Sequence, residues 1–360
     1  MLIRVSTMNW DDYKNRFYHF AKYDNKDDNY IDSCLNYAEK LFLKDIPVIY
    51  DVTHFSKLVG YKEAYIMKVS NSQGSFYREF KIPKKKKGEY RDICEPLPNL
   101  KNIQRWILDE ILNKLKPSPY SKAFRVGYSI KDNAKYHRNQ KKLLNLDIKD
   151  YFKSIGYKKV YNFFRSLGYS KHVSVVLANV CTLDDELPQG APTSPMLSNL
   201  ITQRLDLRIA KFASKNKIRY TRYADDLTFS GDFEEGIVIN FVRKVLLSDG
   251  FLINEQKTRV RKQNQQQEVT GIVVNEKLQA SKKYRKSLRQ KIYYIKRYGL
   301  EDHISKIEFD NKIRYLYHLL GTANFILNVN PNDEETKEYF NYLKQLLFQY
   351  KLKKLDQEVE

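Results

Sequence analysis

Apolar and polar residues alternate in short runs through the middle of the chain, and this pattern predicts β-strands. The run Leu143-Leu-Asn-Leu-Asp-Ile148 is mostly apolar but contains an acid, which is typical of a buried strand with a functional side chain at its end. Residues 218–229 read as two strands joined by a very tight turn, with Asp225 and Asp226 at its tip. Further strands are expected at residues 77–82, 90–94, 251–253 and 269–274.

Apolar residues three or four positions apart predict amphipathic helices in much of the rest of the chain. Residues 31–41 carry one such apolar face. A rigid loop rich in Pro and Gly, residues 187–195, leads into what we expect to be one long helix from Pro195 to about Ala213. Other helices are expected at residues 55–60, 100–115, 158–167, 174–181, 237–247, 282–297, 313–327 and 335–354.

The chain is strongly basic and rich in aromatic residues. It has 64 Lys and Arg against 43 Asp and Glu among 360 residues, a formal net charge of +21, with 28 Tyr and 19 Phe interleaved. Cations neutralise phosphates and aromatic rings stack on bases, so this composition indicates a nucleic-acid partner. A host whose proteins are all rich in lysine would give the same balance. The length is sufficient for two or three packed units.

The three cysteines, Cys34, Cys94 and Cys181, lie far apart and form no C-x-x-C pair. This argues against a disulfide framework and against a zinc site, and it favours a reducing compartment. The first residues lack the apolar core of a signal peptide, and the sequence contains no apolar run of about 18 residues. We therefore expect a soluble protein of the cytoplasm.

Three acidic residues lie at the end of a predicted strand or in the predicted hairpin turn. Asp147 would be costly in a core unless it is paired or bound to a cation. If its strand neighbours the hairpin of Asp225 and Asp226, the three carboxylates meet and can hold two Mg²⁺ ions. Two such ions can activate an attacking hydroxyl and stabilise a leaving pyrophosphate in nucleotidyl transfer. The alternative is an ordinary solvated turn, since Asp is common in turns.

Seven segments, in order along residues 50–280, resemble the motifs of a reverse transcriptase, and more narrowly those of the bacterial retron reverse transcriptases. Tyr223-Ala-Asp-Asp226 resembles the polymerase signature, and Asp147-Ile-Lys-Asp-Tyr-Phe152 resembles the first catalytic-aspartate motif. Asn133-Ala-Lys-Tyr-His137 and Val269-Thr-Gly271 resemble the two narrower retron elements. The remaining matches are Arg91-Asp-Ile-Cys-Glu-Pro96, Leu187-Pro-Gln-Gly-Ala-Pro-Thr-Ser-Pro195 and Gly250-Phe-Leu-Ile-Asn-Glu-Gln-Lys257.

The resemblance implies an α+β fold shaped like a right hand. An N-terminal segment and the fingers would occupy residues 1–140, and a palm with an antiparallel sheet and helices would occupy residues 141–278. A helical thumb would occupy residues 279–360. Residues 1–45 fall outside the match and are a candidate docking segment for a partner protein.

The resemblance also implies roles for the residues around the aspartates. Asp147, Asp225 and Asp226 would be catalytic and would bind two Mg²⁺ ions, with the carbonyl of Ile148 as a further metal ligand. Phe152 would be the steric gate, whose ring leaves no room for a 2′-hydroxyl and so selects deoxynucleotides. The alternative for Phe152 is an ordinary core aromatic, and it can be both.

Nucleotide binding would fall to basic residues and to one loop. Arg91 and one of Lys84 to Lys87 would clamp the triphosphate of the incoming dNTP. Gln189 and Gly190 would line the pocket, where glycine lets the backbone approach closely. Lys257 would protonate the departing pyrophosphate, or else it is a surface lysine.

RNA binding is expected at the two retron elements and on the thumb. Asn133 and His137 would recognise the cognate RNA, or else they form a hydrogen-bonded pair that braces the fingers against the palm. Further expected contacts are Val269, Thr270 and Gly271 near the primer and Lys282, Lys283 and Arg285 on the basic thumb helix.

The resemblance therefore implies RNA-directed DNA synthesis from dNTP substrates. A retron-type enzyme would bind its own structured noncoding RNA and start from the 2′-hydroxyl of a guanosine in that RNA. The product would be a branched RNA–DNA hybrid, used in anti-phage defence to hold a separate effector protein in check. One alternative is another bacterial defence or group II intron-like reverse transcriptase without a branched product. The other is a scaffold that binds RNA and an effector without polymerising.

Overall fold

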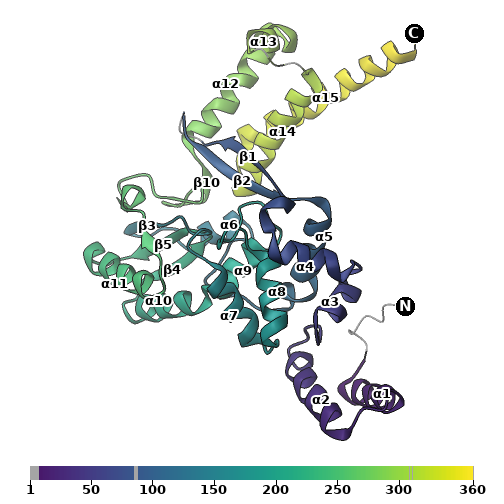
Figure 1. Ribbon diagram of the computed structural model, residues 1–360. Helices are drawn as coiled ribbons and strands as arrows, with labels where there is room; N and C mark the ends of the chain where they lie inside the picture. The colour runs from purple at the N-terminus through teal and green to yellow at the C-terminus, as the bar shows by residue number, and fades with distance from the viewer. Residues whose placement is uncertain (1–7, 85–87, 308, 310, 360) are drawn as a thin grey trace.

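The computed structural model describes residues 8–84, 88–307, 309 and 311–359. Figure 1 shows three regions in chain order: a pair of helices near the N-terminus, a central body built on a sheet, and a group of helices that carries the C-terminus. Within the described ranges, no helix combines the length and the apolar character that crossing a membrane would need.

The central sheet is antiparallel and is ordered around β3 (Lys142–Lys149). One edge of β3 pairs with β5 (Asp226–Gly231), which pairs in turn with β4 (Arg219–Tyr223). The other edge pairs with β6 (Leu252–Ile253) at one end of β3 and with β7 (Arg259–Lys262) at the other. The leucines of β3 are buried, as its apolar run predicts. The tight hairpin expected around the adjacent aspartates is confirmed.

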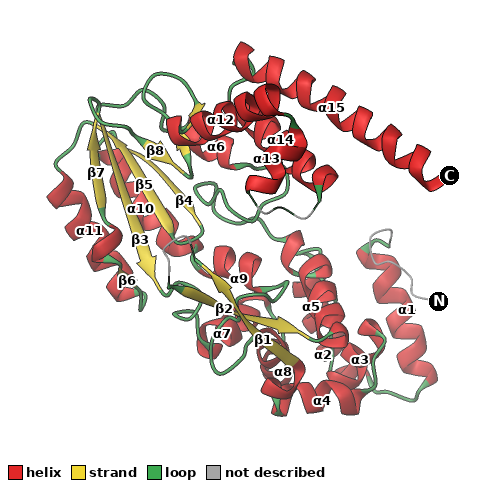
Figure 2. Cartoon of the chain, turned by 90° about the horizontal axis from the view of Figure 1, so that it is seen from above, coloured by secondary structure: helices red, strands yellow, loops and turns green. Residues whose placement is uncertain are grey.

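Two helices lie along the strands of this sheet, as Figure 2 shows. They are α10 (Gln203–Lys215), which contacts β4, and α11 (Glu235–Ser248), which contacts β6. The two helices contact each other through the rings of Phe212 and Phe241, which stack with their centroids 3.9 Å apart. The helix predicted at residues 237–247 is confirmed as α11. Together α10 and α11 form a layer that packs against the sheet.

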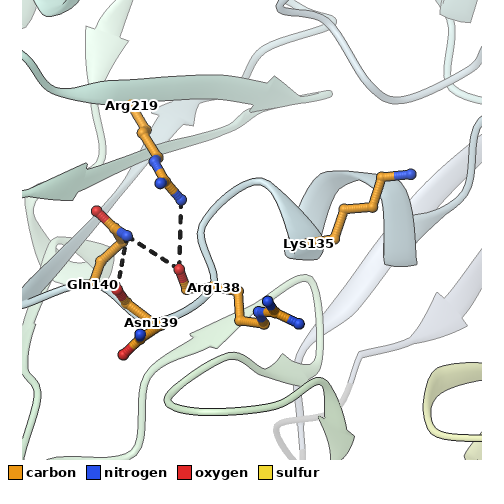
Figure 3. A pocket seen from close by; sticks show the side chains of 5 residues that line it. All are labelled: Lys135, Arg138, Asn139, Gln140 and Arg219. Carbon is orange, nitrogen blue, oxygen red and sulfur yellow. Dashed lines mark hydrogen bonds between the residues drawn. The ribbon is translucent and has the colours of Figure 1, made fainter.

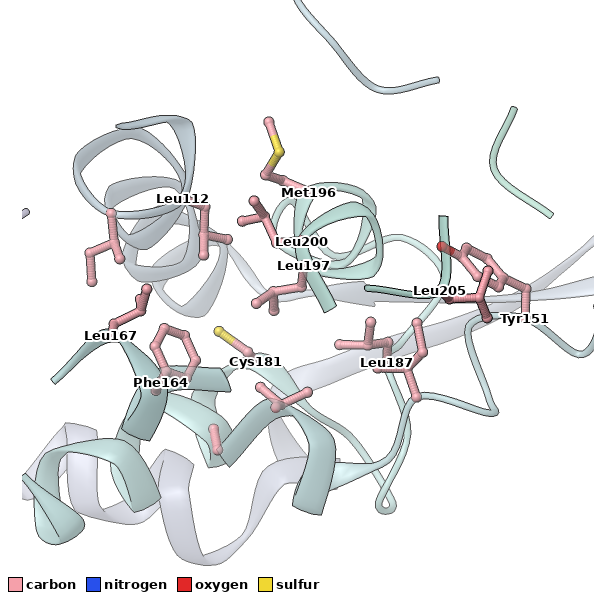
Figure 4. Packing of buried hydrophobic residues seen from close by; sticks show 14 of the residues in the cluster. Leu112, Tyr151, Phe164, Leu167, Cys181, Leu187, Met196, Leu197, Leu200 and Leu205 are labelled. Atoms are coloured by element: carbon pink, nitrogen blue, oxygen red, sulfur yellow. The ribbon is translucent and has the colours of Figure 1, made fainter. Parts of the chain in front are cut away.

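A second group of helices builds the rest of the central core. It contains α5 (Pro98–Glu110), α7 (Tyr157–Leu167), α8 (Lys171–Cys181) and α9 (Ser194–Ile201). The helix expected to run to Leu115 stops at Glu110, and a short 3-10 helix, Leu112–Lys114, follows it. Burying each large apolar side chain stabilises the fold by about 1.5–3 kcal/mol. Figure 4 shows Leu112, Phe164, Cys181, Leu197 and Leu200 together in this core.

The single helix expected from Pro195 to Ala213 is wrong, because the structure divides it into α9 and α10. Thr202 stands between them with φ −88° and ψ 8°, outside the helical range. Its Oγ1 donates a hydrogen bond to the carbonyl of Ser198 at 2.6 Å. A hydroxyl bound to the carbonyl four residues earlier tends to bend a helix. The local bond of Thr202 therefore accompanies the break that the apolar periodicity does not reveal.

The single strand expected at residues 269–274 is also wrong. It is a hairpin of two short strands, β8 (Glu268–Val269) and β9 (Ile272–Val273). Thr270 and Gly271 form the turn with φ values of 48° and 85°. Two consecutive positive φ values belong to the type of two-residue turn that favours glycine, so the Thr-Gly pair is a turn signal that the β-branched neighbours mask.

The N-terminal region contains one predicted and one unpredicted helix. The helix predicted at residues 31–41 is α2 (Asp28–Phe42), and α1 (Trp10–Tyr23) precedes it. The predicted hairpin of β1 (Tyr77–Pro83) and β2 (Tyr90–Pro96) is confirmed, and Lys85 to Lys87 at its tip lie outside the described residues. Between α2 and β1 lie α3 (Val52–Val59), α4 (Glu63–Asn71) and the 3-10 helix Gln73–Phe76.

The C-terminal helices share an apolar cluster of their own, which begins at Ala280 in β10 (Gln279–Ala280). Strand β10 pairs with β9 and so joins these helices to the small sheet of β8 and β9. The helix α13 is absent from the sequence prediction, while the basic helix and the last two helices are confirmed. The four helices are α12 (Lys282–Tyr298), α13 (Leu300–Lys306), α14 (Lys312–Val329) and α15 (Glu334–Val359).

Candidate active site

The three acids singled out in the sequence meet at one end of the central sheet. Asp147 lies directly opposite Asp226 in the pairing of β3 with β5. Asp225 occupies the two-residue turn between β4 and β5, and its carbonyl accepts a hydrogen bond from the backbone N–H of Ile148 at 2.9 Å. Ala224 completes the turn with a φ of 56°. The backbone of Ile148 is thus tied to the turn, and the convergence predicted from the two motifs is present.

This end of the sheet carries an excess of negative charge. Burial raises the pKa of Asp225, and the neighbouring charge of Asp147 raises it further. Although Asp226 keeps part of its side chain in contact with solvent, withdrawal from water raises its pKa to about 7, and the charges of Asp225 and Asp147 add to this. Carboxylates that resist ionisation together form a site that a cation would stabilise.

Asp147 has its own partners. One of its oxygens accepts a hydrogen bond from Lys257 Nζ at 2.8 Å, and the other accepts one from Asn254 Nδ2 at 3.0 Å. Both residues flank or belong to a 3-10 helix, Glu255–Lys257, that follows β6. Asn254 was not singled out in the sequence, although it lies inside the motif that ends at Lys257.

The donor set suits a divalent cation, but one carboxylate is engaged elsewhere. In the described part of the chain no three His, Cys, Asp or Glu side chains are already grouped closely enough to hold a metal ion. Asp147 turns its oxygens toward Lys257 and Asn254. Asp225 and Asp226 have raised pKa values, and within the described residues no cationic side chain hydrogen-bonds to either of them. The oxygens of Asp225 and Asp226, together with those of Asp147, fit a metal such as Mg²⁺, provided that Lys257 yields its place at Asp147.

Metal binding at this site is expected to strengthen as the pH rises through about 7. A proton on Asp226, whose pKa is raised to about 7, must leave before the carboxylate can bind a cation. Mn²⁺ should therefore bind about tenfold more weakly near pH 6 than near pH 8, measured by electron paramagnetic resonance. The raised pKa also affects the metal-free fold. Because Asp226 holds its proton up to about pH 7 in the folded state but loses it at about pH 4 in the unfolded state, the fold should lose stability as the pH rises from about 4 to about 7.

The control for this pH dependence is Asp226→Asn, which removes the titrating carboxylate. That variant should bind Mn²⁺ more weakly than the wild type at every pH and should lose the change in affinity between about pH 6 and about pH 8. A wild-type dissociation constant that stays the same over this interval would refute the assignment of the titrating group.

The predicted nucleotide loop lies against β2 of the basic hairpin. The carbonyl of Gln189 accepts a hydrogen bond from the backbone N–H of Cys94 at 2.8 Å. Gly190 has a φ of 128°, and a Cβ there would lie 2.8 Å from the carbonyl oxygen of Cys94. The close approach that requires glycine in this structure is to β2, and the expected lining of a nucleotide pocket by Gln189 and Gly190 stays a prediction. Arg91 in the same strand is exposed, and its positive charge acts to lower the pKa of Asp225 against the larger effects of burial and Asp147.

Phe152, the expected steric gate, is half-buried and contacts two other rings. Its ring centroid lies 5.5 Å from that of Tyr151 and 6.2 Å from that of Phe124. Tyr151 is buried, and its hydroxyl donates a hydrogen bond to the carbonyl of Ser198 at 3.1 Å. Phe124 was not singled out in the sequence.

A buried ion pair contacts the turn between β4 and β5. Arg222 and Asp206 are both fully buried, and the guanidinium donates to both carboxylate oxygens of Asp206 at 2.7 Å. The remaining Nη1 of Arg222 donates to Tyr151 Oη at 2.8 Å and to the carbonyl of Ala224 at 3.0 Å. This network was not predicted from the sequence. The signal for it is Arg222, a basic residue at a strand position where the alternation of apolar and polar residues predicts a side chain that faces the core.

Asn133 and His137 belong to the interior. Neither side chain is exposed, and both hydrogen-bond to Thr221 Oγ1, His137 through Nε2 at 2.7 Å and Asn133 through Oδ1 at 2.6 Å. The other ring nitrogen of His137 is 2.7 Å from Ser230 Oγ. Burial lowers the pKa of His137 to about 3, with smaller contributions from nearby positive charges. The expected RNA contact is corrected accordingly: these side chains brace the chain around α6 (Ile130–Lys135) against β4 and β5.

A basic hollow of about 470 Å³ lies next to this buried pair. Figure 3 shows Arg219 reaching from β4 toward the carbonyl of Arg138, with Lys135 on the adjacent helix. Lys135 pairs with Asp132, while no acidic side chain in the described residues forms an ion pair with Arg138 or Arg219. An anion such as a nucleic-acid phosphate would therefore meet these three cations and not the buried side chains of Asn133 and His137.

The remaining predicted RNA contacts divide between interior and surface. Val269 is buried in an apolar cluster with Ala134, and Thr270 Oγ1 donates to the carbonyl of Ile130 at 3.3 Å. The two retron-like elements therefore pack against each other. Gly271, Lys282 and Lys283 are exposed, and Arg285 is half-buried with its Nε donating to the carbonyl of Ala280 at 3.3 Å.

Comparison with known proteins agrees with these motifs. A family model described as reverse transcriptase (RNA-dependent DNA polymerase) matches residues 82–274. The Retron Ec86 reverse transcriptase of Escherichia coli is 34% identical over 278 residues, which are 76% of this chain and 82% of that protein. The Retron Mx65 reverse transcriptase of Myxococcus xanthus is 33% identical over 297 residues, 77% of this chain and 67% of that protein. Among solved structures, the telomerase of Candida albicans aligns with 80% of this chain and 65% of its own, with 14% identity and a TM-score of 0.45.

Proposed function

The chain belongs to the reverse transcriptase family and, within it, to the bacterial retron enzymes, and we propose that it copies part of its own structured noncoding RNA into DNA. As a member of that family it is an RNA-directed DNA polymerase. In the proposed reaction the 2′-hydroxyl of a guanosine in the RNA is the primer, so the product is a branched RNA–DNA hybrid that serves anti-phage defence. The observation that carries the proposal is the 34% identity to a retron enzyme over most of both chains.

The proposed division of labour follows the right hand. We assign the N-terminal segment and fingers to residues 1–140, the palm to residues 141–278 and the thumb to residues 279–360. The sheet of β3 to β7 with its carboxylates supports the palm assignment. The separate apolar cluster of the C-terminal helices supports the thumb assignment.

In this proposal Asp147, Asp225 and Asp226, with the carbonyl of Ile148, hold two Mg²⁺ ions. When bound, such ions lower the pKa of the attacking hydroxyl and neutralise charge on the leaving pyrophosphate. Asn254 fixes one oxygen of Asp147, which leaves the other to exchange Lys257 for a cation. Lys257, already 2.8 Å from that carboxylate and still 58% exposed, is then free to donate its proton to the pyrophosphate.

Substrate binding uses the surfaces around this centre. In this proposal Arg91 and one of Lys84 to Lys87 on the basic hairpin clamp the triphosphate. Gln189 and Gly190 line the nucleotide pocket from a loop that lies against that hairpin. Phe152 forms the floor under the sugar and excludes a 2′-hydroxyl. For the RNA we propose contacts with the hollow at Lys135, Arg138 and Arg219 and with Gly271, Lys282, Lys283 and Arg285.

The proposed separate effector would dock on the outer surface of α1. Phe20 and Tyr23 on this helix are 71% and 81% exposed, and exposed aromatic side chains of this kind mark protein interfaces. Deleting residues 1–45 would be a poor test, because Leu41 is buried in the central core and Lys44 Nζ donates to the carbonyl of Leu167 at 2.7 Å.

Replacing Phe20 and Tyr23 together by serine should lower recovery of the effector at least about tenfold, since interface aromatics carry much of a binding energy. The measurement is the amount of the protein that co-purifies with the wild-type chain from its host. DNA synthesis should persist, and Lys14→Ala on the same helix serves as the matched surface control. Equal loss of effector and DNA synthesis, or loss of neither, would count against this surface.

The proposed function is tested on the nucleic acid that co-purifies with the protein from its host. A denaturing gel with and without RNase and debranching enzyme would be run beside the Asp225→Asn/Asp226→Asn variant. We expect a short DNA that changes mobility on debranching and is absent from the variant. Unbranched DNA would favour a general defence or intron-like reverse transcriptase, and RNA alone from both proteins would favour the scaffold.

A further inference from the structure

Phe124 has an unusual backbone conformation beside the proposed sugar site. Its φ is 56°, in the left-handed region that bulky side chains rarely adopt. Gly127, three residues later, has a φ of 78°, but glycine pays no steric penalty there. A strained residue of this kind persists only where its surroundings hold it, and such residues concentrate at functional sites.

The buried network that contacts the turn between β4 and β5 also holds this strained segment. Asn199 Nδ2 donates a hydrogen bond to the carbonyl of Ala123 at 2.8 Å, and its Oδ1 accepts one from Ser121 Oγ at 2.6 Å. The same Oδ1 lies 3.3 Å from Nη1 of Arg222, which also donates to the carbonyl of Ala224. One set of buried bonds therefore fixes both the segment before Phe124 and the turn that carries Asp225.

The strained backbone directs the ring of Phe124 to Phe152. The two ring centroids are 6.2 Å apart with the ring planes at 52°, a favourable tilted arrangement for aromatic pairs. Phe124 remains 43% exposed, so its ring reaches Phe152 from the solvent side and is not part of the core. Burial of Phe124 in the core therefore does not explain why the chain keeps an aromatic residue in this conformation.

We propose that Phe124 determines sugar specificity together with Phe152, by fixing the position of the Phe152 ring. The inference rests on the proposed role of Phe152 in excluding a 2′-hydroxyl. An aromatic ring excludes one oxygen atom only if it cannot rotate or shift to make room. Tyr151 limits the movement of Phe152 from the buried side, and Phe124 limits it from the open side. The selectivity then depends on the pair and not on Phe152 alone.

The test compares single-nucleotide incorporation of a dNTP and of the matching rNTP on a primed RNA template with Mg²⁺. Phe124→Ala should lower the ratio of the two kcat/KM values about tenfold, a size typical of discrimination by shape alone. Most of the change should be a gain in kcat/KM for the rNTP. Phe124→Tyr keeps the ring and should keep the ratio. Val126→Ala, at a 97% exposed position of the same loop, should also leave the ratio unchanged.

Phe124→Gly separates specificity from stability. Glycine relieves the left-handed backbone, so the urea midpoint of unfolding should not fall, while the sugar selectivity should drop as it does in Phe124→Ala. Wild-type selectivity in both variants would overturn the inference.

The Phe152→Val variant shows whether a negative result refutes the role of Phe124 or the proposed role of Phe152. If Phe152→Val relaxes selectivity and the Phe124 variants do not, the role of Phe124 is refuted and that of Phe152 stands. If Phe152→Val leaves selectivity intact, the inference falls with the proposed gate. A wild-type protein that incorporates neither nucleotide would refute the proposed function itself.

Discussion

Replacing Asp225 or Asp226 by asparagine is expected to lower the rate of DNA synthesis at least about 1,000-fold. Asparagine keeps the shape of the side chain but carries no negative charge, so it binds a divalent cation weakly. The charge stabilisation that such a cation gives to phosphoryl transfer is worth several kcal/mol, and each 1.4 kcal/mol or so is a factor of ten in rate. Primer extension on an RNA template with saturating dNTP measures the loss directly.

The same substitutions should leave the metal-free fold at least as stable as before. Burial, and then the neighbouring carboxylates, raise the pKa of Asp225 and of Asp226, so each ionised carboxylate costs free energy in the folded state. A neutral amide removes that repulsion. Thermal unfolding near neutral pH without metal should therefore show an equal or higher midpoint, and RNA should still co-purify. Lost activity with retained stability identifies a functional site and not a structural one.

Asp232→Asn is the matched control for these two substitutions. Asp232 follows β5 in the same strand-loop segment, is exposed, and pairs at 2.8 Å with Lys141, which is also exposed. Exposed pairs contribute little, so this variant should polymerise at the wild-type rate. Synthesis that persists in Asp225→Asn, or that falls equally in Asp232→Asn, would contradict the assignment of the catalytic carboxylates.

The sequence reveals the end of the sheet that carries the three acids because its signals are local. The apolar run before Asp147 and the tight turn at Asp225 and Asp226 each identify a strand from a few neighbouring residues. The antiparallel pairing of β3 with β5, which the sequence left as a condition, then brings the three acids to one end of the sheet. The positions and roles of these residues could therefore be proposed before the structure was known.

The supporting contacts could not be found in this way because they join distant segments. Asp206 lies in α10 and Arg222 in β4, and nothing in either segment states that the two face each other. Thr202 breaks a helix through one hydroxyl bond while the apolar period continues past it. The sequence left two interpretations open for Asn133 and His137, an RNA contact and an internal brace. Both side chains are buried and hydrogen-bond to Thr221, which supports the brace.

Removing one partner of the buried ion pair is the second large effect that we expect. Arg222→Met should destabilise the fold by about 3–5 kcal/mol, because it leaves the Asp206 carboxylate buried without its cation. Tyr220 Oη, 2.8 Å from Asp206 Oδ1, remains as a neutral donor but does not compensate a charge. Arg222→Lys should recover only part of the loss, since a lysine cannot make the two-pronged contact or reach the carbonyl of Ala224 at the same time.

Three comparisons make this prediction specific to the pair. Asp206→Leu should destabilise by a similar amount, and the double variant Arg222→Met/Asp206→Leu should be more stable than the sum of the single losses implies, because no buried charge remains. Arg219→Met is the matched control in the same strand. Arg219 is exposed, and among the described residues its partners are two backbone carbonyls at 2.9 and 3.4 Å, so its loss should cost no more than about 1 kcal/mol.

Urea unfolding measures the stability of the wild type and of each variant, and primer extension in the folded range measures the consequence for the active site. Because Arg222 holds the carbonyl of Ala224, the double variant should synthesise DNA more slowly even where its stability is restored. Such a result would separate two roles of one guanidinium, balancing a buried carboxylate and fixing the turn before Asp225. If Arg222→Met unfolds at the same urea concentration as Arg219→Met, the buried pair does not stabilise the palm as we argue.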